Sequence, residues 1–297
     1  MRTPADHEFG SPATELKLSL VNAYSCAFTR ALRGKFSELW YFDAFAGTGE
    51  RTERVPARSG GLFGAVPEEI IRHPGSAKIA INVQPPFDRL VFVEQRPRKA
   101  KALQALCAQH PNRVIDVIAG DANKEIPELL RSVGWRSRRA VMFLDPYGMT
   151  VDWPTLKAVA RTRAIDLWFL FSLSGLYRQA ARSAAAIDAH KRAAITRALG
   201  TNEWEKELYA PQRGFFSDQL PLHRTANVAG LQDYVRRRLE TIFPVVLPPL
   251  VLPPHKKPQR FSLFFATSNP SPAAKALATR IADHILKVGI SSHTRPR

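Results

Sequence analysis

The sequence has 297 residues, and its 45% of apolar residues is enough for the core of one large α/β domain or of two smaller domains. This composition excludes a wholly disordered chain. Only two cysteines occur, Cys26 and Cys107, which excludes both a disulfide framework and a cysteine zinc site and is typical of a reducing compartment. No apolar stretch approaches the roughly 20 residues of a membrane-spanning helix, and residues 1–15 are too polar for a signal peptide. We therefore expect a cytoplasmic protein without membrane contact.

The chain is strongly basic, with 43 lysines and arginines against 26 acidic residues and a formal net charge of +17. Because clusters of basic side chains contact phosphate backbones, this charge predicts nucleic acid, DNA or RNA, as a partner. The alternative is a basic, solvated surface, since bacteria with GC-rich genomes also favour arginine. The candidate nucleic-acid contacts are Arg178, Arg236, Arg237, Arg238, Lys256 and Lys257.

Apolar residues at helical spacing predict a first helix over 14–33, followed by a strand over 39–43. Residues 50–75 are rich in Gly, Pro and Arg and are expected to form a long loop. Such a loop could cover a ligand or could simply be mobile. The next helix is expected over 76–82, with Ser76 as its N-cap.

Short apolar strands and helices then alternate regularly, which predicts a parallel sheet connected by right-handed crossovers. The expected strands cover 90–93, 114–118, 140–144 and 166–171, and the helices between them cover 98–109, 126–133 and 153–161.

The second half of the chain departs from this alternation. Residues 176–227 are expected to form a helical insert or cap of two or three helices, one of them over 177–198. A helix over 228–243, a hairpin of 245–252 with 260–267, and a closing helix over 271–287 follow. The predicted fold is a Rossmann-like α/β domain, 14–175 and 228–287, with a mostly parallel sheet and helices on both faces.

Polar junctions follow the predicted strands, and their side chains would meet at the carboxyl edge of the sheet, where open parallel sheets bind ligands. At the first junction Asp43 could anchor an amine or a water, and Gly47 and Gly49 let the backbone approach a ligand. At the second, Glu94 could accept both hydroxyls of a ribose. At the third, Asp121 could accept the exocyclic amine of adenine. Together these junctions predict an adenosine cofactor.

Each junction also has a purely structural interpretation. Gly-x-Gly turns are more often structural than functional. Glu94 could be a solvated acid near Arg96 and Arg98, and Asp121 could be a helix N-cap that needs no ligand. The occurrence of all these junctions in one chain favours the cofactor site.

The fourth junction is Asp145-Pro146-Tyr147-Gly148, after a strongly apolar strand. The Asp145 carboxylate and the Pro146 carbonyl could orient an exocyclic amine toward an electrophilic methyl group, and Tyr147 could stack on the base. The alternative is a β-turn with Pro and Gly at favourable positions.

The sequence lacks the residue patterns that several other kinds of reaction require. No phosphate-binding Gly-x-x-x-x-Gly-Lys loop occurs, the eight histidines have no metal-ligand spacing, and Cys107 and Ser172 lack the context of a nucleophile. A nicotinamide enzyme would explain the first junction but not the fourth. No metal is expected.

Five segments together resemble those of Class I S-adenosylmethionine-dependent methyltransferases, and more narrowly of the three-Cys-motif partner protein family, over about residues 14–285. These segments are 41–49, 75–77, 120–123, 143–148 and 264–270. The resemblance implies S-adenosyl-L-methionine as cofactor. It places the methionine end at Asp43, Phe45, Ala46, Gly47 and Gly49, the ribose at Glu94, and the adenine at Asp121 and Ala122. It also implies a protein partner bearing a three-cysteine motif.

The Asp145 motif is similar to the Asp-Pro-Pro-Tyr of amino-methyltransferases acting on adenine or cytosine and to the Asp-Pro-Phe-Gly of tRNA guanine dimethyltransferases. It departs from the first in having Tyr147 and Gly148 at its third and fourth places, which leaves the base open. The predicted function is methyl transfer to an exocyclic amine of a nucleic-acid base. The alternatives are a non-catalytic cofactor- and nucleic-acid-binding module that serves a protein partner, and a methyltransferase for a small molecule or a protein.

Overall fold

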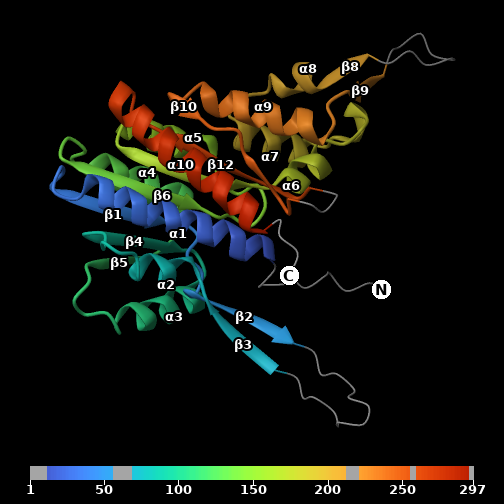
Figure 1. The fold of residues 1–297 in the computed structure, drawn as a ribbon. Helices are drawn as coiled ribbons and strands as arrows, with labels where there is room; N and C mark the ends of the chain where they lie inside the picture. The colour runs from blue at the N-terminus through green and yellow to red at the C-terminus, as the bar shows by residue number, and fades with distance from the viewer. Residues whose placement is uncertain (1–11, 56–68, 212–220, 255–258, 294–297) are drawn as a thin grey trace.

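The structure, a computed structural model, describes residues 12–55, 69–211, 221–254 and 259–293. Helices cover both faces of a central sheet, and a two-stranded hairpin projects away from the body (Figure 1). Within these ranges no helix is both long and apolar enough to cross a membrane.

The central sheet has the strand order β10-β12-β7-β6-β1-β4-β5, and β11 also pairs with β12. Its strands are β1 (Glu38–Asp43), β4 (Arg89–Glu94), β5 (Ile115–Ala119), β6 (Arg138–Leu144), β7 (Ile165–Phe171), β10 (Val245–Val246), β11 (Leu250–Leu252) and β12 (Phe261–Thr267). Strands β5, β4, β1, β6 and β7 are parallel, whereas β12 is antiparallel to β7. The strand order reverses between β1 and β6, as in a doubly wound sheet. The predicted Rossmann-like fold is therefore confirmed.

The helices divide between two cores, one on each face of the sheet. They are α1 (Pro12–Leu32), α2 (Ser76–Ile81), α3 (Pro97–Cys107), α4 (Ala122–Ser132), α5 (Trp153–Thr162), α6 (Leu173–Gln179), α7 (Ala189–Leu199), α8 (Trp204–Leu208), α9 (Val228–Glu240) and α10 (Pro272–His293). Helices α1, α2, α3 and α10 cover one face, and α4 to α9 cover the other.

Strand β1 shows why the predicted strands are continuously apolar. Leu39 and Tyr41 belong to the core beneath α1, whereas Trp40 and Phe42 belong to the core on the opposite face. Successive side chains of a strand point to opposite faces, so a strand covered on both sides needs apolar residues at every position.

The expected loop over 50–75 is wrong for the part that the structure describes. Strand β2 (Glu50–Val55) pairs in antiparallel fashion with β3 (Glu69–Pro74), and the tip of this hairpin lies outside the described residues. The Gly75 N–H donates to the Gly49 carbonyl oxygen at 2.8 Å. The hairpin is thus an insertion. The glycine turn before it and α2 after it are hydrogen-bonded to each other as if they followed one another directly in the sequence.

The single helix predicted over 177–198 is also wrong. Helix α6 ends at Gln179, a 3₁₀ turn follows over Ala184–Ala186, and α7 starts only after Asp188, which accepts a hydrogen bond from the Lys191 N–H. Tertiary pairing explains the break, because this segment lies against β9 (Leu222–Arg224), the partner of β8 (Tyr209–Pro211). Local helix propensity is overridden by these contacts.

The predicted hairpin of 245–252 with 260–267 is confirmed as two short strands on one long strand. Both β10 and β11 pair with β12 in antiparallel fashion, with Val245 opposite Thr267 and Leu252 opposite Phe261. Prolines 248 and 249 separate the two short strands. Proline has no N–H to donate, so the ladder is interrupted there.

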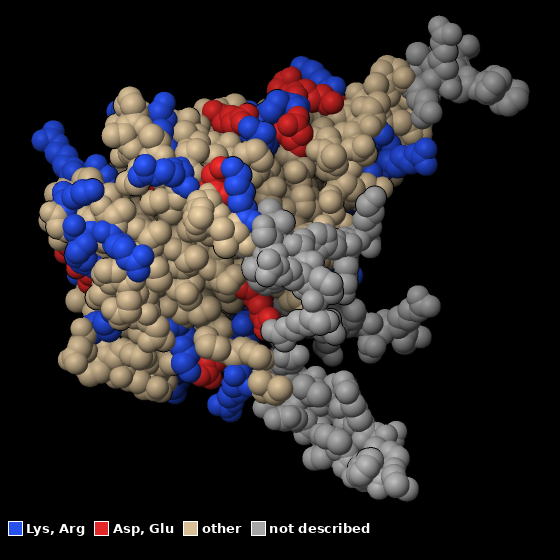
Figure 2. All heavy atoms as spheres, viewed as in Figure 1, with Lys and Arg blue, Asp and Glu red and all other residues tan. Residues whose placement is uncertain are grey.

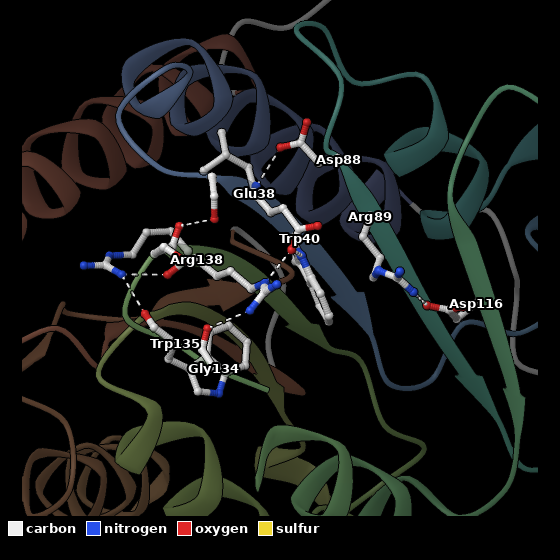
Figure 3. Close-up of polar contacts among 12 residues, drawn as sticks. Glu38, Trp40, Asp88, Arg89, Asp116, Gly134, Trp135 and Arg138 are labelled. Carbon is white, nitrogen blue, oxygen red and sulfur yellow. Dashed lines mark hydrogen bonds and ion pairs between the residues drawn. The ribbon is translucent and has the colours of Figure 1, made fainter. Parts of the chain in front are cut away.

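The amino edge of the sheet holds a network of paired charges (Figure 3). Trp40 lies between the guanidinium groups of Arg89 and Arg138, at 5.1 and 5.8 Å from its ring, and its Nε1 donates to Glu38 at 3.0 Å. Arg138 also pairs with Glu38, and this hydrogen bond lowers the pKa of Glu38. Arg89 pairs with Asp116 at 2.5 Å. These ion pairs join β4 to β5 and β1 to β6 at the starts of the strands.

Candidate functional site

The glycine turn after β1 requires its glycines for different reasons. Gly47 and Gly49 have φ values of 64° and 78°, a region that favours glycine. A Cβ on Gly49 would lie 2.4 Å from Leu106 Cδ2, so α3 packs directly against the turn. A Cβ on Gly75 would lie 2.8 Å from the Gly49 carbonyl. The turn is therefore held closely from two sides.

Asp43 is fully buried at the end of β1. Its Oδ1 accepts a hydrogen bond from the Phe45 N–H at 3.2 Å, whereas its buried Oδ2 has no hydrogen-bond partner among the described residues. Burial raises the pKa of Asp43 to about 7, and the negative charge of Asp145 adds to this. The nearby Ser76 hydroxyl, the Phe45 N–H and Lys17 lower that pKa. A buried carboxylate oxygen without a partner suits a bound cationic group.

The backbone N–H groups of Phe45 and Ala46 both donate hydrogen bonds, the first to Asp43. The Ala46 N–H donates to the Val93 carbonyl at 3.1 Å, which ties the turn to β4, and Ala46 is 5% exposed.

Ser76, the expected N-cap of α2, is instead its first residue, and Gly75 occupies the cap. Gly75 takes this place because the turn leaves no room for a Cβ there.

Glu94 is buried at the end of β4 and is not the solvated acid of the alternative interpretation. Its Oε2 accepts a hydrogen bond from the Gly47 N–H at 3.0 Å, and its Oε1 accepts one from the Arg96 N–H at 2.9 Å. A carboxylate has about four acceptor sites, so each oxygen can still accept one more hydrogen bond. The carboxylate is thereby oriented beside the glycine turn.

Asp121 caps α4, as its structural interpretation predicts. Its Oδ1 accepts a hydrogen bond from the Asn123 N–H at 2.9 Å, and Ala122 is buried behind it. Asn123 in turn accepts hydrogen bonds from the Asp152 N–H and the Thr155 hydroxyl, both at 2.9 Å. Capping uses one oxygen of Asp121 and leaves the cofactor role open.

Asp145, directly after β6, forms an ion pair that the sequence does not suggest. Lys17 Nζ of α1 lies 2.5 Å from Asp145 Oδ2, and the two side chains are 12% and 24% exposed. Lys17 follows the buried Leu16 in an ordinary amphipathic pattern, so no local signal marks it. Neither Asp145 Oδ1 nor the Pro146 carbonyl accepts a hydrogen bond from another residue of the described ranges. Within the described ranges, both of these acceptors at the junction therefore lack a donor.

Tyr147 extends from the same junction to the surface. Pro146 is buried, whereas Tyr147 is 48% exposed. Lys99 Nζ donates to the Tyr147 hydroxyl at 3.1 Å and lies 5.2 Å from the ring centre, and the Arg96 guanidinium lies 5.7 Å from it. Two cations from the start of α3 therefore lie near the tyrosine ring.

Four of the predicted basic contacts lie in the described residues, on the neighbouring helices α6 and α9. Arg178 is exposed on α6, but Arg236 pairs with Glu240 at 3.0 Å on α9. Arg237 pairs with Asp233 and with Glu207, the latter at 3.1 Å, and Arg238 donates to the Leu199 carbonyl and packs on Trp153. Lys256 and Lys257 lie outside the described residues. On the face shown in Figure 2, basic residues form small separate groups, some beside acidic ones.

A cavity of about 290 Å³ lies elsewhere, between α1 and α10. The Tyr24 hydroxyl donates to Asp166 at 2.7 Å in its wall, and burial raises the pKa of Asp166 to about 6. None of the predicted site residues lines this cavity. In the described part of the chain, no group of three or more His, Cys, Asp or Glu side chains could hold a metal ion.

No protein-family model and no curated protein matches this sequence. Among solved structures, a Legionella pneumophila strain Philadelphia 1 protein of family DUF519 is 13% identical, with 90% of this chain and 91% of that chain covered and a TM-score of 0.49. Trm1 from Pyrococcus horikoshii, in complex with S-adenosyl-L-methionine, is 13% identical (96% and 61% covered, TM-score 0.42). Spermidine synthase from Thermotoga maritima is 10% identical (88% and 62% covered, TM-score 0.41). All three TM-scores are below 0.5, and these similarities assign the chain neither an activity nor a substrate.

Proposed function

We propose that this chain is an S-adenosylmethionine-dependent methyltransferase that acts on an exocyclic amine of a nucleic-acid base. The observation that carries the proposal is the buried Asp43 carboxylate, whose Oδ2 has no described hydrogen-bond partner beside the glycine turn. Parallel strands β1, β4 and β6 end at the same edge, so Asp43, Glu94 and Asp145 share it.

The residues of this edge fit the cofactor. Asp43 offers a negative acceptor for its cationic methionine end, and Gly47 has nothing within 4 Å of an added Cβ, so space is left in front of the turn. Glu94 is oriented by two backbone N–H groups and keeps acceptor sites for the ribose hydroxyls. Asp121 keeps one oxygen for the adenine amine. When bound, the cofactor supplies an electrophilic methyl group on its sulfonium.

The remaining task of the chain is to position the amine. Asp145 Oδ1 and the Pro146 carbonyl would each accept one N–H of the amine and so direct its lone pair toward the methyl group. Lys17 fixes the other oxygen of Asp145. Methyl transfer depends mainly on such positioning, and the proton that the methylated nitrogen loses passes to water, so no catalytic His or Cys is needed.

Two variants test this proposal. Isothermal titration with S-adenosylmethionine should show binding that Asp43→Ala abolishes. Asp145→Ala should bind the cofactor as the wild type does but transfer no radiolabelled methyl group to pools of DNA and RNA. Asp116→Ala, which removes an acid at the opposite edge of the sheet, is the control and should retain both. Loss of cofactor binding in Asp145→Ala would contradict the role given to that residue.

The second candidate is a non-catalytic module that binds cofactor and nucleic acid and serves a protein partner. The Lys17–Asp145 ion pair favours this candidate, because Lys17 already binds one oxygen of the carboxylate that would have to orient the amine for methyl transfer. The family resemblance suggests a partner with a three-cysteine motif. Cofactor binding without transfer to any nucleic acid, together with capture of such a partner, would support this candidate.

A further inference from the structure

The tyrosines of this chain divide sharply by exposure. Tyr147 and Tyr177 are 48% and 47% exposed. The other four are at most 6% exposed: Tyr24, Tyr41, Tyr209 and Tyr234. Tyrosines in a core are held by packing, whereas an exposed aromatic ring beside a candidate site presents a surface on which a ligand can stack.

Both exposed rings are packed against cations. The Arg224 guanidinium lies 3.9 Å from the centre of the Tyr177 ring and donates to the Tyr177 carbonyl at 3.3 Å. Arg96 and Lys99 lie farther from the centre of the Tyr147 ring, at 5.7 and 5.2 Å. Each site thus combines a half-exposed aromatic ring with a cation, the pair that stacks on bases and holds their backbone.

The two rings belong to one edge of the sheet. Tyr147 follows β6, and Tyr177 lies on α6, which starts directly after the neighbouring parallel strand β7. The segments touch, since a Cβ on Gly175 of α6 would lie 3.2 Å from Met149 Cγ. A ligand at the Asp145 junction could therefore extend over α6.

The arginines around Tyr177 have no acidic partner among the described residues. Arg178 and Arg182 are exposed, and their side chains form no ion pair or hydrogen bond with other residues in the described part of the chain. Arg236 and Arg237, in contrast, are paired with acids on α8 and α9. Exposed arginines beside an exposed ring favour a phosphate-bearing ligand.

We propose that Tyr147 and Tyr177 are two stacking platforms of a track for an unpaired nucleic-acid strand. The base to be methylated stacks on Tyr147, a flanking base stacks on Tyr177, and Arg178 and Arg182 contact the phosphates. The assignment of the target base to Tyr147 rests on the proposed function; the track itself does not. Paired bases are stacked within a duplex and cannot use such platforms, so the partner is a single strand or a base flipped out of a duplex.

Fluorescence anisotropy with labelled oligonucleotides of mixed sequence, single-stranded and duplex, tests the track. Tyr177→Ala should weaken single-strand binding roughly 5- to 150-fold, since one stacked base is lost. Tyr177→Phe should bind as the wild type does, because the ring remains. The control, Val288→Ala, removes a side chain of similar exposure on α10 and should have no effect. Arg178→Gln should reduce the salt slope by about 0.7, whereas the paired Arg236→Gln should not.

Single-strand binding that is unchanged in Tyr177→Ala, or lost equally in Tyr177→Phe, would overturn the proposal. So would the failure of the wild type to bind any oligonucleotide. Binding and cofactor titration are measured separately from methyl transfer. If Tyr177→Ala weakens strand binding but the wild type transfers no methyl group, only the proposed function is refuted. If the wild type transfers methyl groups and Tyr177→Ala transfers them equally well, only the track is refuted.

Discussion

Replacement of Asp43 by Asn is expected to stabilise the folded protein above neutral pH and, at the same time, to weaken cofactor binding. Asn has the shape of Asp and can still accept the Phe45 N–H through its amide oxygen. It carries no charge, so it removes the cost of burying a carboxylate whose Oδ2 has no described partner.

The size of this effect follows from the pKa. An aspartate in an unfolded chain has a pKa of about 3.9, whereas burial raises the pKa of Asp43 to about 7 in the folded protein. Between these values the folded protein holds a proton that the unfolded chain has released, so stability falls as the pH rises through this window. The cost is fully present above the folded pKa. One pKa unit corresponds to about 1.4 kcal/mol, which gives a cost of about 4 kcal/mol for about three units.

Urea unfolding of both proteins across this pH range measures the difference. Asp43→Asn should be more stable than the wild type by up to about 4 kcal/mol near pH 8 and by only about 1 to 2 kcal/mol near pH 5, with unchanged m-values. Asp121→Asn is the control, and it should differ by no more than a few tenths of a kcal/mol because Asn caps a helix as well as Asp does. A gain that does not depend on pH, or a loss near pH 8, would refute the reasoning.

The same carboxylate links pH to the proposed cofactor. A cationic ligand binds the ionised form, so wild-type affinity should fall below the pKa of about 7, and binding below that pH should release a proton. Titration in two buffers of different ionisation enthalpy measures this release. Asp43→Asn should show weak binding at every pH. Tight cofactor binding by Asp43→Asn would show that the Asp43 carboxylate does not bind the cofactor.

Two further changes test the surroundings of the site. Lys17→Met should slow methyl transfer about tenfold or more, because Asp145 loses its orientation, and Lys17→Arg should retain most of the rate; a faster Lys17→Met would show that the lysine blocks the site. Lys17→Met should also move the pH midpoint of cofactor binding upward, since Lys17 lowers the pKa of Asp43. Gly75→Ala should destabilise the protein by about 1 to 3 kcal/mol and weaken cofactor binding, because the new Cβ meets backbone of the glycine turn. Gly134→Ala, whose Cβ would lie 3.5 Å from its nearest neighbour, is the matched control for thermal unfolding.

The alternation of strands and helices over 90–171 was predictable because side-chain periodicity is local: every second residue of a strand and every third or fourth of a helix share a face. The hairpin of β2 and β3 was not, since its strands are short, lie among Gly and Pro, and pair with each other across 13 intervening residues that the structure does not describe, 56–68. The break between α6 and α7 was missed for a related reason. Its alanine-rich sequence suits a helix, and only the pairing with β9 interrupts it.

By itself, the sequence determined which strand ends carry the acids and glycines, and hence the Rossmann-like sheet and the edge at which a site should lie. The tertiary structure decided what surrounds those groups. It buries Asp43, brings Lys17 to Asp145 from 128 residues away, and pairs Arg237 with acids on two helices. Periodicity is a property of neighbouring residues, whereas desolvation and ion pairing depend on which distant surfaces pack together, and no local pattern records that.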